Sequence, residues 1–559
     1  MFHLTFVRAR AALLLVVVLL FASACGAADD AAPVDASEVT ASDDGAAEVD
    51  DGASAAPDPD SDAPAPEETG GEDAAAGGSL TIGLGSLTTE FNPFKANSAP
   101  RSYLTNPLFS RLTQLDTTVA PPALGPGIAA SWERTDDLTW RFSLVPDLVF
   151  PNGEPIDATA VVASIEYGTD PTSQSFIAGA LGAIESATAV DPLTVDVGMS
   201  VPVAGMPELL SSMPIVPPAY FAEVGEDFFQ QPIGSGPWVL AEHVPGERIV
   251  FEPNPDAIGG APLLDRVTFV AIPEDAARVA ALRAGDVDVI NKVPTDSLAG
   301  VEGNGDVLYS HLESGAYVVD LFTTEGPLAD PLVRQALNMA IDREALNDAI
   351  MGGEGRPAQG QLPTPSDAGF CDGVEPFPYD PDGAAALLAE AGVSDVELTF
   401  QTSQGFLQND RLLSQAIAEQ LQQVDGITSV TLDTMEFSAY LEVFNGQAER
   451  ADLFAWRPTS TPTLDAMVQL GRTTSDFPTH NLGFSDADYD ATFDAAQAAD
   501  PGSAERQALI CEMTEQMREQ APWLYVMQLP DTWAHDEAVT GFAVDAGGNP
   551  LLDQIGLAG

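Results

Sequence analysis

Residues 26–78 constrain the fold most, because this stretch cannot form a packed core. It consists almost entirely of Ala, Asp, Glu, Gly, Pro and Ser, with 16 acidic residues and no basic residue. So little apolar surface cannot offset the entropy of folding, and the like charges repel one another. We therefore expect 26–78 to be a disordered acidic linker. The fold must come from residues 79–559, and a single core stops growing at roughly 250–300 residues, so two or three domains are expected.

Residues 1–25 have the layout of an export signal peptide. Arg8 and Arg10 precede an unbroken apolar run over 11–22, and small residues follow up to Cys25. The run is too short, and too promptly followed by polar sequence, to be a good membrane span. Its end, ASACG, resembles the lipobox of bacterial lipoproteins, although Leu is more usual than the first Ala. The resemblance implies lipid attachment at Cys25; an ordinary secretory signal with an incidental cysteine is the alternative.

The remaining part of the chain is strongly acidic. Residues 79–559 contain 69 acidic and 19 basic side chains, a net charge of −50, and their only lysines are Lys95 and Lys292. This balance argues against nucleic acid as a partner, since phosphate binding needs clustered positive charge. The charge fits either steering of cationic ligands or solubility in a salty medium.

Strand-like and helix-like segments alternate in this part, which indicates an α/β class. Residues 79–85 read as a strand, and Trp140, Phe142 and Leu144 alternate with polar residues as in a half-buried hairpin strand. Gly285 is a stop signal for the helix that precedes it. Further helix-start signals are Asp157, Asp330-Pro331, Asp380-Pro381 and Asp500-Pro501.

Sequence signatures of catalysis and of metal binding are absent. The chain has no G-x-S-x-G, H-E-x-x-H or C-x-x-C motif, and its five histidines lack metal-ligand spacing. We therefore expect no enzyme, no cofactor and no metal. Cys371 and Cys511 could pair in an exported protein, but sequence cannot show proximity, so the disulfide stays open.

Five blocks of the chain carry a family resemblance: 123–168, 232–290, 327–346, 379–392 and 521–542. The second block contains Gly234-Ser235-Gly236-Pro237-Trp238. Together the blocks resemble the extracellular solute-binding proteins of family 5, the peptide/nickel type, which have Gly-Thr-Gly-Pro-Tyr at the place of that motif. The blocks occur in the family's order and together extend over almost all of 79–545.

The resemblance implies an α/β fold of the type II periplasmic-binding-protein kind, with two α/β lobes, a hinge and an extra domain inserted in the first lobe. After the signal peptide and the linker, the expected parts are lobe 1 over 79–115, the inserted domain over 116–225, lobe 1 again over 226–313, lobe 2 over 314–525 and a return to lobe 1 over 526–559.

The implied function is that of a substrate-binding lipoprotein of an ABC importer. By hinge closure it would capture peptides or a related small organic solute, and it would deliver the ligand to the permease and ATPase subunits. It would work as a monomer, lipid-anchored at the outer face of the cytoplasmic membrane or in the periplasm. The alternatives are a ligand-sensing receptor lipoprotein and an exported hydrolase on the same scaffold. The identity of the ligand, whether peptide, sugar or metal chelate, stays open.

The segment after residue 452 is the main candidate for ligand binding. Residues 452–456 read as a strand, and ligands of open α/β sheets lie beyond the carboxyl ends of strands. The family's peptide-binding members typically have Trp-x-x-Asp here, and that Asp pairs with the peptide's α-amino group. This chain has Trp456-Arg457-Pro458-Thr459, without the acidic anchor. We therefore expect Arg457 to meet a ligand carboxylate or phosphate; alternatively it points to solvent and another acid, such as Asp465, anchors an amine.

Two aromatic residues from other segments, Phe91 and Tyr317, are also expected to bind the ligand. Each of them could instead belong to a core. The complete set of expected ligand-binding residues is Phe91, Tyr317, Trp456, Arg457 and Thr459.

Overall fold

The computed structural model describes residues 77–96, 99–116, 119, 122–179, 181–323, 325–404, 407, 409–444, 446, 448–459, 463–475 and 484–558. The expected signal peptide, the expected linker and Cys25 lie outside these residues.

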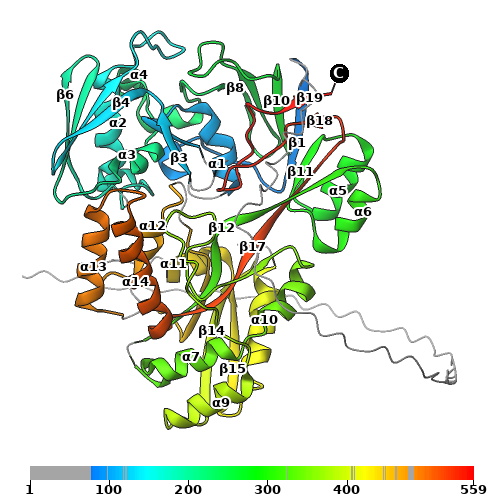
Figure 1. Cartoon of the computed structure of the whole chain (residues 1–559). Coiled ribbons are helices and arrows are strands. Elements are labelled where there is room, and N and C mark those ends of the chain that lie inside the picture. Colours follow the sequence, from blue (N-terminus) through cyan, green and yellow to red (C-terminus); the bar gives the residue numbers. More distant parts are fainter. Residues whose placement is uncertain are drawn as a thin grey trace, which may run out of the picture. The chain divides into compact units, whose positions relative to one another are not determined.

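One large mixed sheet runs through the described part of the chain (Figure 1). Its strand order is β15-β14-β16-β12-β17-β11-β1-β10-β9-β8, with β13 beside β17. Two long strands, β12 (Val307–Leu321) and β17 (Trp523–His535), lie in the middle and pair antiparallel. The strands on either side of this pair belong to two different lobes.

Lobe 1 contains the half of the sheet from β11 to β8. Its strands are β1 (Ser79–Leu84), β8 (Trp238–Val244), β9 (Arg248–Pro253), β10 (Arg266–Ala271) and β11 (Val289–Asn291). Its helices include α5 (Asp275–Ala284) and α6 (Leu298–Glu302), and a small pair of strands near the end of the chain is β18 (Val539–Thr540) and β19 (Gly556–Leu557).

Lobe 2 contains the other half of the sheet and most of the helices. Its strands are β13 (Arg356–Pro357), β14 (Val396–Ser403), β15 (Ile427–Met435) and β16 (Leu453–Trp456). Its helices are α7 (Pro331–Met339), α8 (Arg343–Leu346), the π-helical turn η8 (Asn347–Met351), α9 (Pro381–Glu390), α10 (Asp410–Leu421), α11 (Phe437–Phe444), α12 (Ala466–Leu470), α13 (Ala487–Ala498) and α14 (Ala504–Gln520).

A four-stranded antiparallel sheet of order β4-β5-β7-β6 lies apart from the large one, with a two-stranded sheet β2-β3. These elements are β2 (Thr113–Asp116), β3 (Ala123–Pro126), β4 (Ala129–Asp136), β5 (Thr139–Leu144), β6 (Ile184–Asp191) and β7 (Thr194–Met199), with helices α1 (Ala99–Thr105), α2 (Ala158–Thr169), α3 (Met206–Leu209) and α4 (Pro218–Val224). Their buried side chains form one continuous cluster with those of β1 and β10. The domain boundaries given above stay a prediction.

Capping residues explain where several helices begin. Asp157, Asp330 and Asp380 each accept a backbone N–H bond in the first turn of α2, α7 and α9, as predicted. The helix expected to open at 500–501 begins later, because Ser503 is the residue whose side chain caps α14. Asp500 and Pro501 lie before the helix, where the backbone N–H of Ser503 donates to the carbonyl of Asp500.

The pairing of β12 with β17 is broken near the middle of β12. Register with β17 shifts between Leu312 and Ala316, so residues 313–315 bulge. Gly315 has φ +83°, and a Cβ there would lie 1.8 Å from the carbonyl oxygen of Pro458. Only glycine fits this position, so the bulge is tightly packed against the segment that follows β16.

Candidate functional site

The carboxyl ends of parallel strands mark the site in each lobe. In lobe 1, β10 and β11 both run parallel to β1. In lobe 2, β15 and β16 both run parallel to β14. Ligands of open α/β sheets bind beyond such ends. The segments that follow β1, β10, β11 and β14 lie around one cavity.

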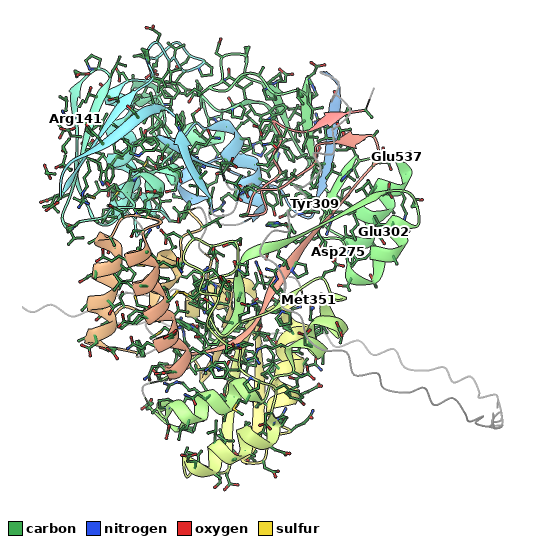
Figure 2. All side chains as sticks on the ribbon, viewed as in Figure 1. Arg141, Asp275, Glu302, Tyr309, Met351 and Glu537 are labelled. Atoms are coloured by element: carbon green, nitrogen blue, oxygen red, sulfur yellow. A yellow bond between two sulfur atoms is a disulfide. The ribbon has the colours of Figure 1, made fainter. Side chains whose placement is uncertain are left out.

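A cavity of about 900 Å³ lies between these segments, with walls from both lobes. In Figure 2 the label of Asp275 marks the lobe-1 side, and that of Met351, next to Ile350, marks the lobe-2 side. The lobe-1 wall includes Ser86, Asp275, Arg278, Asn291, Lys292 and Asp296. The lobe-2 wall includes Ile350, Leu407, Asn409, Asp410, Gln415 and Glu419. This volume lies within the range of roughly 300–1,000 Å³ that is usual for small-molecule sites.

Arg278 holds the lobe-1 wall together from inside. Its side chain is only 2% exposed. The guanidinium donates to four backbone carbonyls, those of residues 272, 273, 291 and 292, and to Asp275 Oδ1 at 2.6 Å. A Cβ at Gly85 would lie 3.2 Å from Arg278 Nη1, so the end of β1 also packs closely on this group. Arg278 is therefore a framework residue whose charge is balanced within the protein.

The lobe-2 wall is ordered by the start of α10. Asp410 Oδ2 accepts from Ser403 Oγ and, at 3.1 Å, from the backbone N–H of Leu407. Asn409 has φ +57°, a left-handed conformation that Asn tolerates better than most residues, and its Nδ2 donates to the Ile350 carbonyl at 3.2 Å. These bonds fix the loop after β14 against the π-helical turn.

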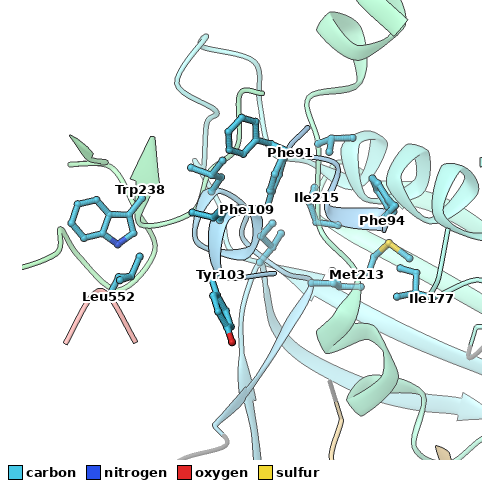
Figure 3. Packing of buried hydrophobic residues seen from close by; sticks show 14 of the residues in the cluster. Phe91, Phe94, Tyr103, Phe109, Ile177, Met213, Ile215, Trp238 and Leu552 are labelled. Atoms are coloured by element: carbon cyan, nitrogen blue, oxygen red, sulfur yellow. The ribbon is translucent and has the colours of Figure 1, made fainter. Parts of the chain in front are cut away.

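Phe91 and Tyr317 are both completely buried. The ring of Phe91 packs edge-on against His243 with centroids 5.0 Å apart, inside the lobe-1 core shown in Figure 3. Tyr317 lies in the lobe-2 core, with its hydroxyl 2.8 Å from Ser414 Oγ. Neither residue lines the cavity. Their ligand contacts stay a prediction, to which this packing adds no support.

Trp456 is also buried, and it contacts charged side chains inside lobe 2. The indole N–H of Trp456 donates to Asp320, which is paired with Arg450 at 3.1 Å. Arg472 lies over the Trp456 ring, with its Cζ 5.4 Å from the centroid. Burial raises the pKa of Asp320 to about 6, although the charge of Arg450 opposes this rise. The predicted contact of Trp456 with a ligand stays untested.

Arg457 meets a carboxylate, and that carboxylate belongs to the protein. Arg457 Nη1 lies 3.0 Å from Glu313 Oε2 and donates to the Ser314 carbonyl at 3.0 Å. The two ionic side chains are only 17% and 19% exposed. The segment after β16 is thus tied to the bulge of β12.

The other two candidates of this segment are also placed. Thr459 is half-buried. Asp465 caps α12 by accepting from Met467 N at 2.9 Å, and it is paired with Arg506 at 2.8 Å. Asp465 therefore has structural partners already.

The sequence of the chain matches a known protein family. A model of the bacterial extracellular solute-binding proteins, family 5 middle, matches residues 123–477, which is more than half of the chain. The chain belongs to this family. The family and the relatives below are solute-binding proteins, not enzymes.

Two sequence relatives of this solute-binding protein are glutathione-binding proteins named GsiB. The one from Pectobacterium atrosepticum is 26% identical over 469 residues, covering 82% of this chain and 90% of that protein. The one from Escherichia coli K12 is 26% identical over 471 residues, covering 81% and 90%.

Solved structures share the fold of the solute-binding protein. DppA from Helicobacter pylori, in complex with the peptide STSA, has a TM-score of 0.74 at 21% identity and covers 87% of this chain and 99% of its own. AppA from Bacillus subtilis, in complex with a nonapeptide, gives 0.73 at 23%, covering 87% and 100%. NikA from Brucella suis, in complex with Fe(III)-EDTA, gives 0.75 at 23%, covering 86% and 100%. The predicted two-lobed periplasmic-binding-protein fold is confirmed.

Strand β17 of the solute-binding protein contains a buried acid that the sequence did not reveal. Asp531 lies on β17 and accepts from the indole N–H of Trp533 at 2.8 Å. Burial raises the pKa of Asp531 above its ordinary value, and the charge of Glu313 adds to the rise, whereas Lys292 opposes it. A sequence signal exists, since Asp531 is the only acidic residue in a strand that is buried throughout.

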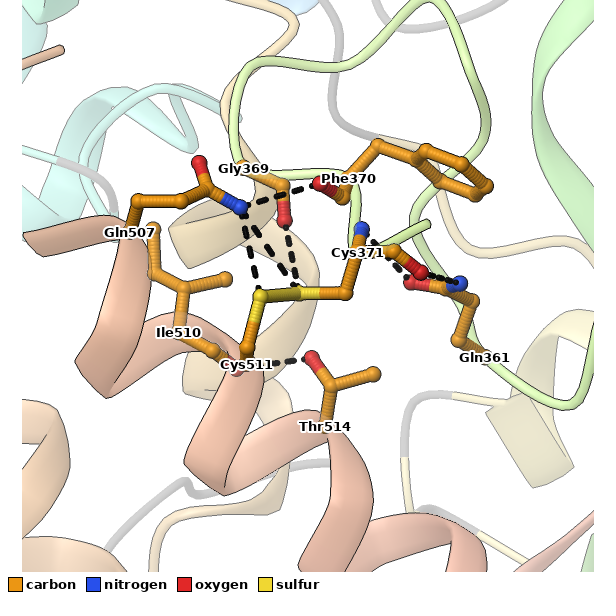
Figure 4. The surroundings of a disulfide bond; sticks show 8 residues. All are labelled: Gln361, Gly369, Phe370, Cys371, Gln507, Ile510, Cys511 and Thr514. Carbon is orange, nitrogen blue, oxygen red and sulfur yellow. Dashed lines mark hydrogen bonds between the residues drawn. A yellow bond between two sulfur atoms is a disulfide. The ribbon is translucent and has the colours of Figure 1, made fainter. Parts of the chain in front are cut away.

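Cys371 and Cys511 form a disulfide in lobe 2 (Figure 4). It joins the loop that follows β13 to α14, across 140 residues of sequence. Gln361 and Gln507 flank it: Gln361 bonds the backbone of Cys371, and Gln507 Nε2 donates to the Phe370 carbonyl. The pairing that the sequence left open is therefore present in the structure.

Proposed function

We propose that this solute-binding protein captures a peptide or a related small organic solute between its lobes and delivers it to the permease and ATPase subunits of an ABC importer. The observation that carries the proposal is the cavity of about 900 Å³ beyond the carboxyl ends of strands from both lobes. Because each lobe supplies one wall, a hinge movement would close the site on its ligand. The protein would act as a monomer.

The chemistry of the walls supports a polar organic ligand. Lys292 supplies positive charge, whereas Asp296 and Glu419 supply negative charge from opposite lobes. Glutathione and peptides, which the relatives' names mention, are polar molecules with ionised groups of both signs. A ligand of this class could meet both kinds of side chain in one cavity.

A free amino terminus of the ligand would not be held after β16. Thr459 stands where the family's peptide-binding members typically have Asp, and Arg457 next to it is paired with Glu313. A buried ammonium near Arg457 would lack a carboxylate partner, which is costly. The ratio of affinities for peptides with free and acetylated amino termini should therefore not change in calorimetric titrations when Thr459 is replaced by Val. A change in this ratio would contradict this part of the proposal, whereas a preference for the free amine that persists would be due to acids of the cavity such as Asp296 and Glu419.

The protein would be exported and held at the membrane by a lipid on Cys25, and residues 26–78 would be the linker between the lipid and the folded part. Among the residues that the structure describes, no helix is both long enough and apolar enough to cross a membrane. Mass spectrometry of the amino-terminal peptide should find an acylated Cys25, and Cys25→Ser should move the protein from the membrane fraction to the soluble fraction. An unmodified amino terminus would contradict the lipid anchor.

Native mass spectrometry of the full chain tests the proposed function most directly. The protein is isolated from bacterial cells without denaturation, and any bound small molecule is released with acid and identified. We expect a peptide mixture or one polar organic solute, lost when Lys292 is replaced. An isolated protein that carries no solute, and binds none from a peptide and amino-acid mixture, would overturn the proposal.

A further inference from the structure

The lobe-1 wall contains an amide whose hydrogen-bonding capacity is not used. Asn291 lines the cavity and is only 2% exposed. Its Oδ1 is buried and accepts no hydrogen bond from any residue that the structure describes. A buried carbonyl oxygen without a donor is unfavourable, and such exceptions need an explanation. Rotation of the Asn291 amide would turn this oxygen toward the cavity, where a ligand N–H would supply the missing donor.

The next residue, Lys292, adopts an uncommon backbone conformation. Its φ is +50°, in the left-handed region that residues with a Cβ usually avoid. Neighbouring side chains of a strand point to opposite faces, but this turn lets Asn291 and Lys292 both line the cavity. Arg278 holds the turn, with its Nε 3.2 Å from the Asn291 carbonyl oxygen and its Nη2 3.4 Å from that of Lys292. Strain of this kind persists where the surroundings impose it, often at ligand sites.

The charge of Lys292 is available to a ligand. Of the ion pairs within 4.0 Å among described residues, none includes Lys292, whereas Arg278 in the same wall is fully bonded by the protein. The charge of Lys292 lowers the pKa of the buried Asp531, but the two side chains are not among the ion pairs within 4.0 Å. In a chain with 85 acidic and 21 basic side chains, an anionic ligand needs such a local cation to offset repulsion.

We propose that Asn291 and Lys292 form the subsite for the carboxyl end of the ligand. The ammonium of Lys292 binds the carboxylate, and Asn291 Oδ1 accepts a hydrogen bond from the amide N–H next to it. A carboxylate adjacent to an N–H is what the last residue of a peptide offers. This inference rests on the proposed function and specifies which end of the ligand meets lobe 1.

The charge half of the subsite is tested with one pair of probes on the full-length protein. Trialanine and trialanine amide differ only in the carboxylate, and calorimetry gives the affinity of each. We expect the wild-type protein to bind the acid about ten- to hundredfold more tightly than the amide, as for hydrogen bonds to charged groups. Lys292→Gln should abolish this preference. The matched control is Lys95→Gln, which removes the other lysine, a partly exposed one near Glu226 outside the cavity.

The amide half is tested with Ala-Ala-Gly and Ala-Ala-sarcosine, of which the second lacks the last N–H. The wild-type protein should prefer the first, and Asn291→Leu should bind both equally. Lys292→Gly guards against a folding artefact, because glycine adopts a left-handed φ without strain. It should keep the stability of the wild type and lose the acid preference.

The outcomes separate the subsite from the proposed function. If the wild type binds acid and amide equally, or if Lys292→Gln weakens both to the same extent, the subsite is wrong while peptide capture stands. If no peptide binds, the peptide class fails, and the solute released from the isolated protein decides. A solute without a carboxylate overturns the subsite, and a carboxylate-bearing solute lost from Lys292→Gln supports it.

Discussion

Arg457 and Lys292 both follow the carboxyl end of a strand, but only Arg457 is neutralised by the protein itself. Arg457 lies 3.0 Å from Glu313, which belongs to the bulge of β12. Lys292 lines the cavity, and none of the described ion pairs includes it. The charge of Arg457 in lobe 2 is therefore neutralised by Glu313, whereas the charge of Lys292 in lobe 1 is the one that we propose for ligand binding. A strand end predicts where ligands bind, whereas the partners of each charge decide which residue can bind them.

If the disulfide of lobe 2 stabilises the fold and does not contribute to the ligand site, breaking it should lower stability and leave binding intact. Cys371→Ser with Cys511→Ser opens a loop of 140 residues, and we expect unfolding free energy to fall by about 4 kcal/mol. Urea unfolding followed by fluorescence measures this loss, and titration with trialanine at a temperature where the variant is folded measures binding. A variant with unchanged stability and lost binding would contradict the framework role.

The lobe-1 side should respond in both properties when its buried anchor is removed. Arg278→Ala leaves backbone carbonyls at residues 272, 273, 291 and 292 without their donor, so stability should fall by about 3 kcal/mol. Ligand affinity should also fall, because the turn at Lys292 loses its support. Arg283→Ala, an exposed arginine in the last turn of the same helix, is the control and should change neither property.

The buried acid beside Trp456 should make lobe 2 sensitive to pH. The pKa of Asp320 in the folded protein is about 6, above its ordinary value, so the folded state holds a proton that the unfolded state releases. The stability that this group contributes is present at low pH and is lost as pH rises from about 4 to about 6. Asp320→Asn does not titrate, so its stability relative to the wild type should rise by roughly 2–3 kcal/mol over that interval. Unfolding curves at several pH values measure this; a constant difference would contradict the raised pKa.

The smallest expected effect is the coupling between Glu313 and Arg457. A double-mutant cycle with Glu313→Gln and Arg457→Gln should give a coupling free energy of about 1 kcal/mol, since the pair is mostly buried. Urea unfolding of the four proteins measures it. A coupling near zero would mean that Arg457 is as free as Lys292, and the contrast between the two cations would disappear.

Local chemistry predicted much of the fold. The helix starts at Asp157, Asp330 and Asp380 follow from side chains that cap the next turn, and these bonds need only neighbouring residues. The start of α14 was misplaced because Asp-Pro and Ser both satisfy the same local rule, and only Ser503 bonds the helix. The order of motifs then predicted two lobes, which the structural comparisons confirm.

The residues around the cavity were not predicted, and the ligand contacts of the predicted residues stay a prediction. The strand-end rule was applied to the segment after β16, and neither Trp456 nor Arg457 lines the cavity, whereas Lys292, which does, was noted only as one of two lysines. The left-handed turn at Lys292 depends on Arg278, and the unsatisfied Oδ1 of Asn291 depends on which groups surround it. Contacts between residues far apart in the chain create both features, so a local pattern cannot show them. The disulfide was left open for the same reason.

The most direct test of the account compares Lys292→Gln and Arg457→Gln in one calorimetric experiment with the solute that the protein carries from cells, or with trialanine. The account predicts about a tenfold or greater loss of affinity for Lys292→Gln, and for Arg457→Gln an affinity close to that of the wild type. The reverse order, with Arg457→Gln losing the ligand and Lys292→Gln keeping it, would contradict the assignment of the ligand's carboxylate to lobe 1.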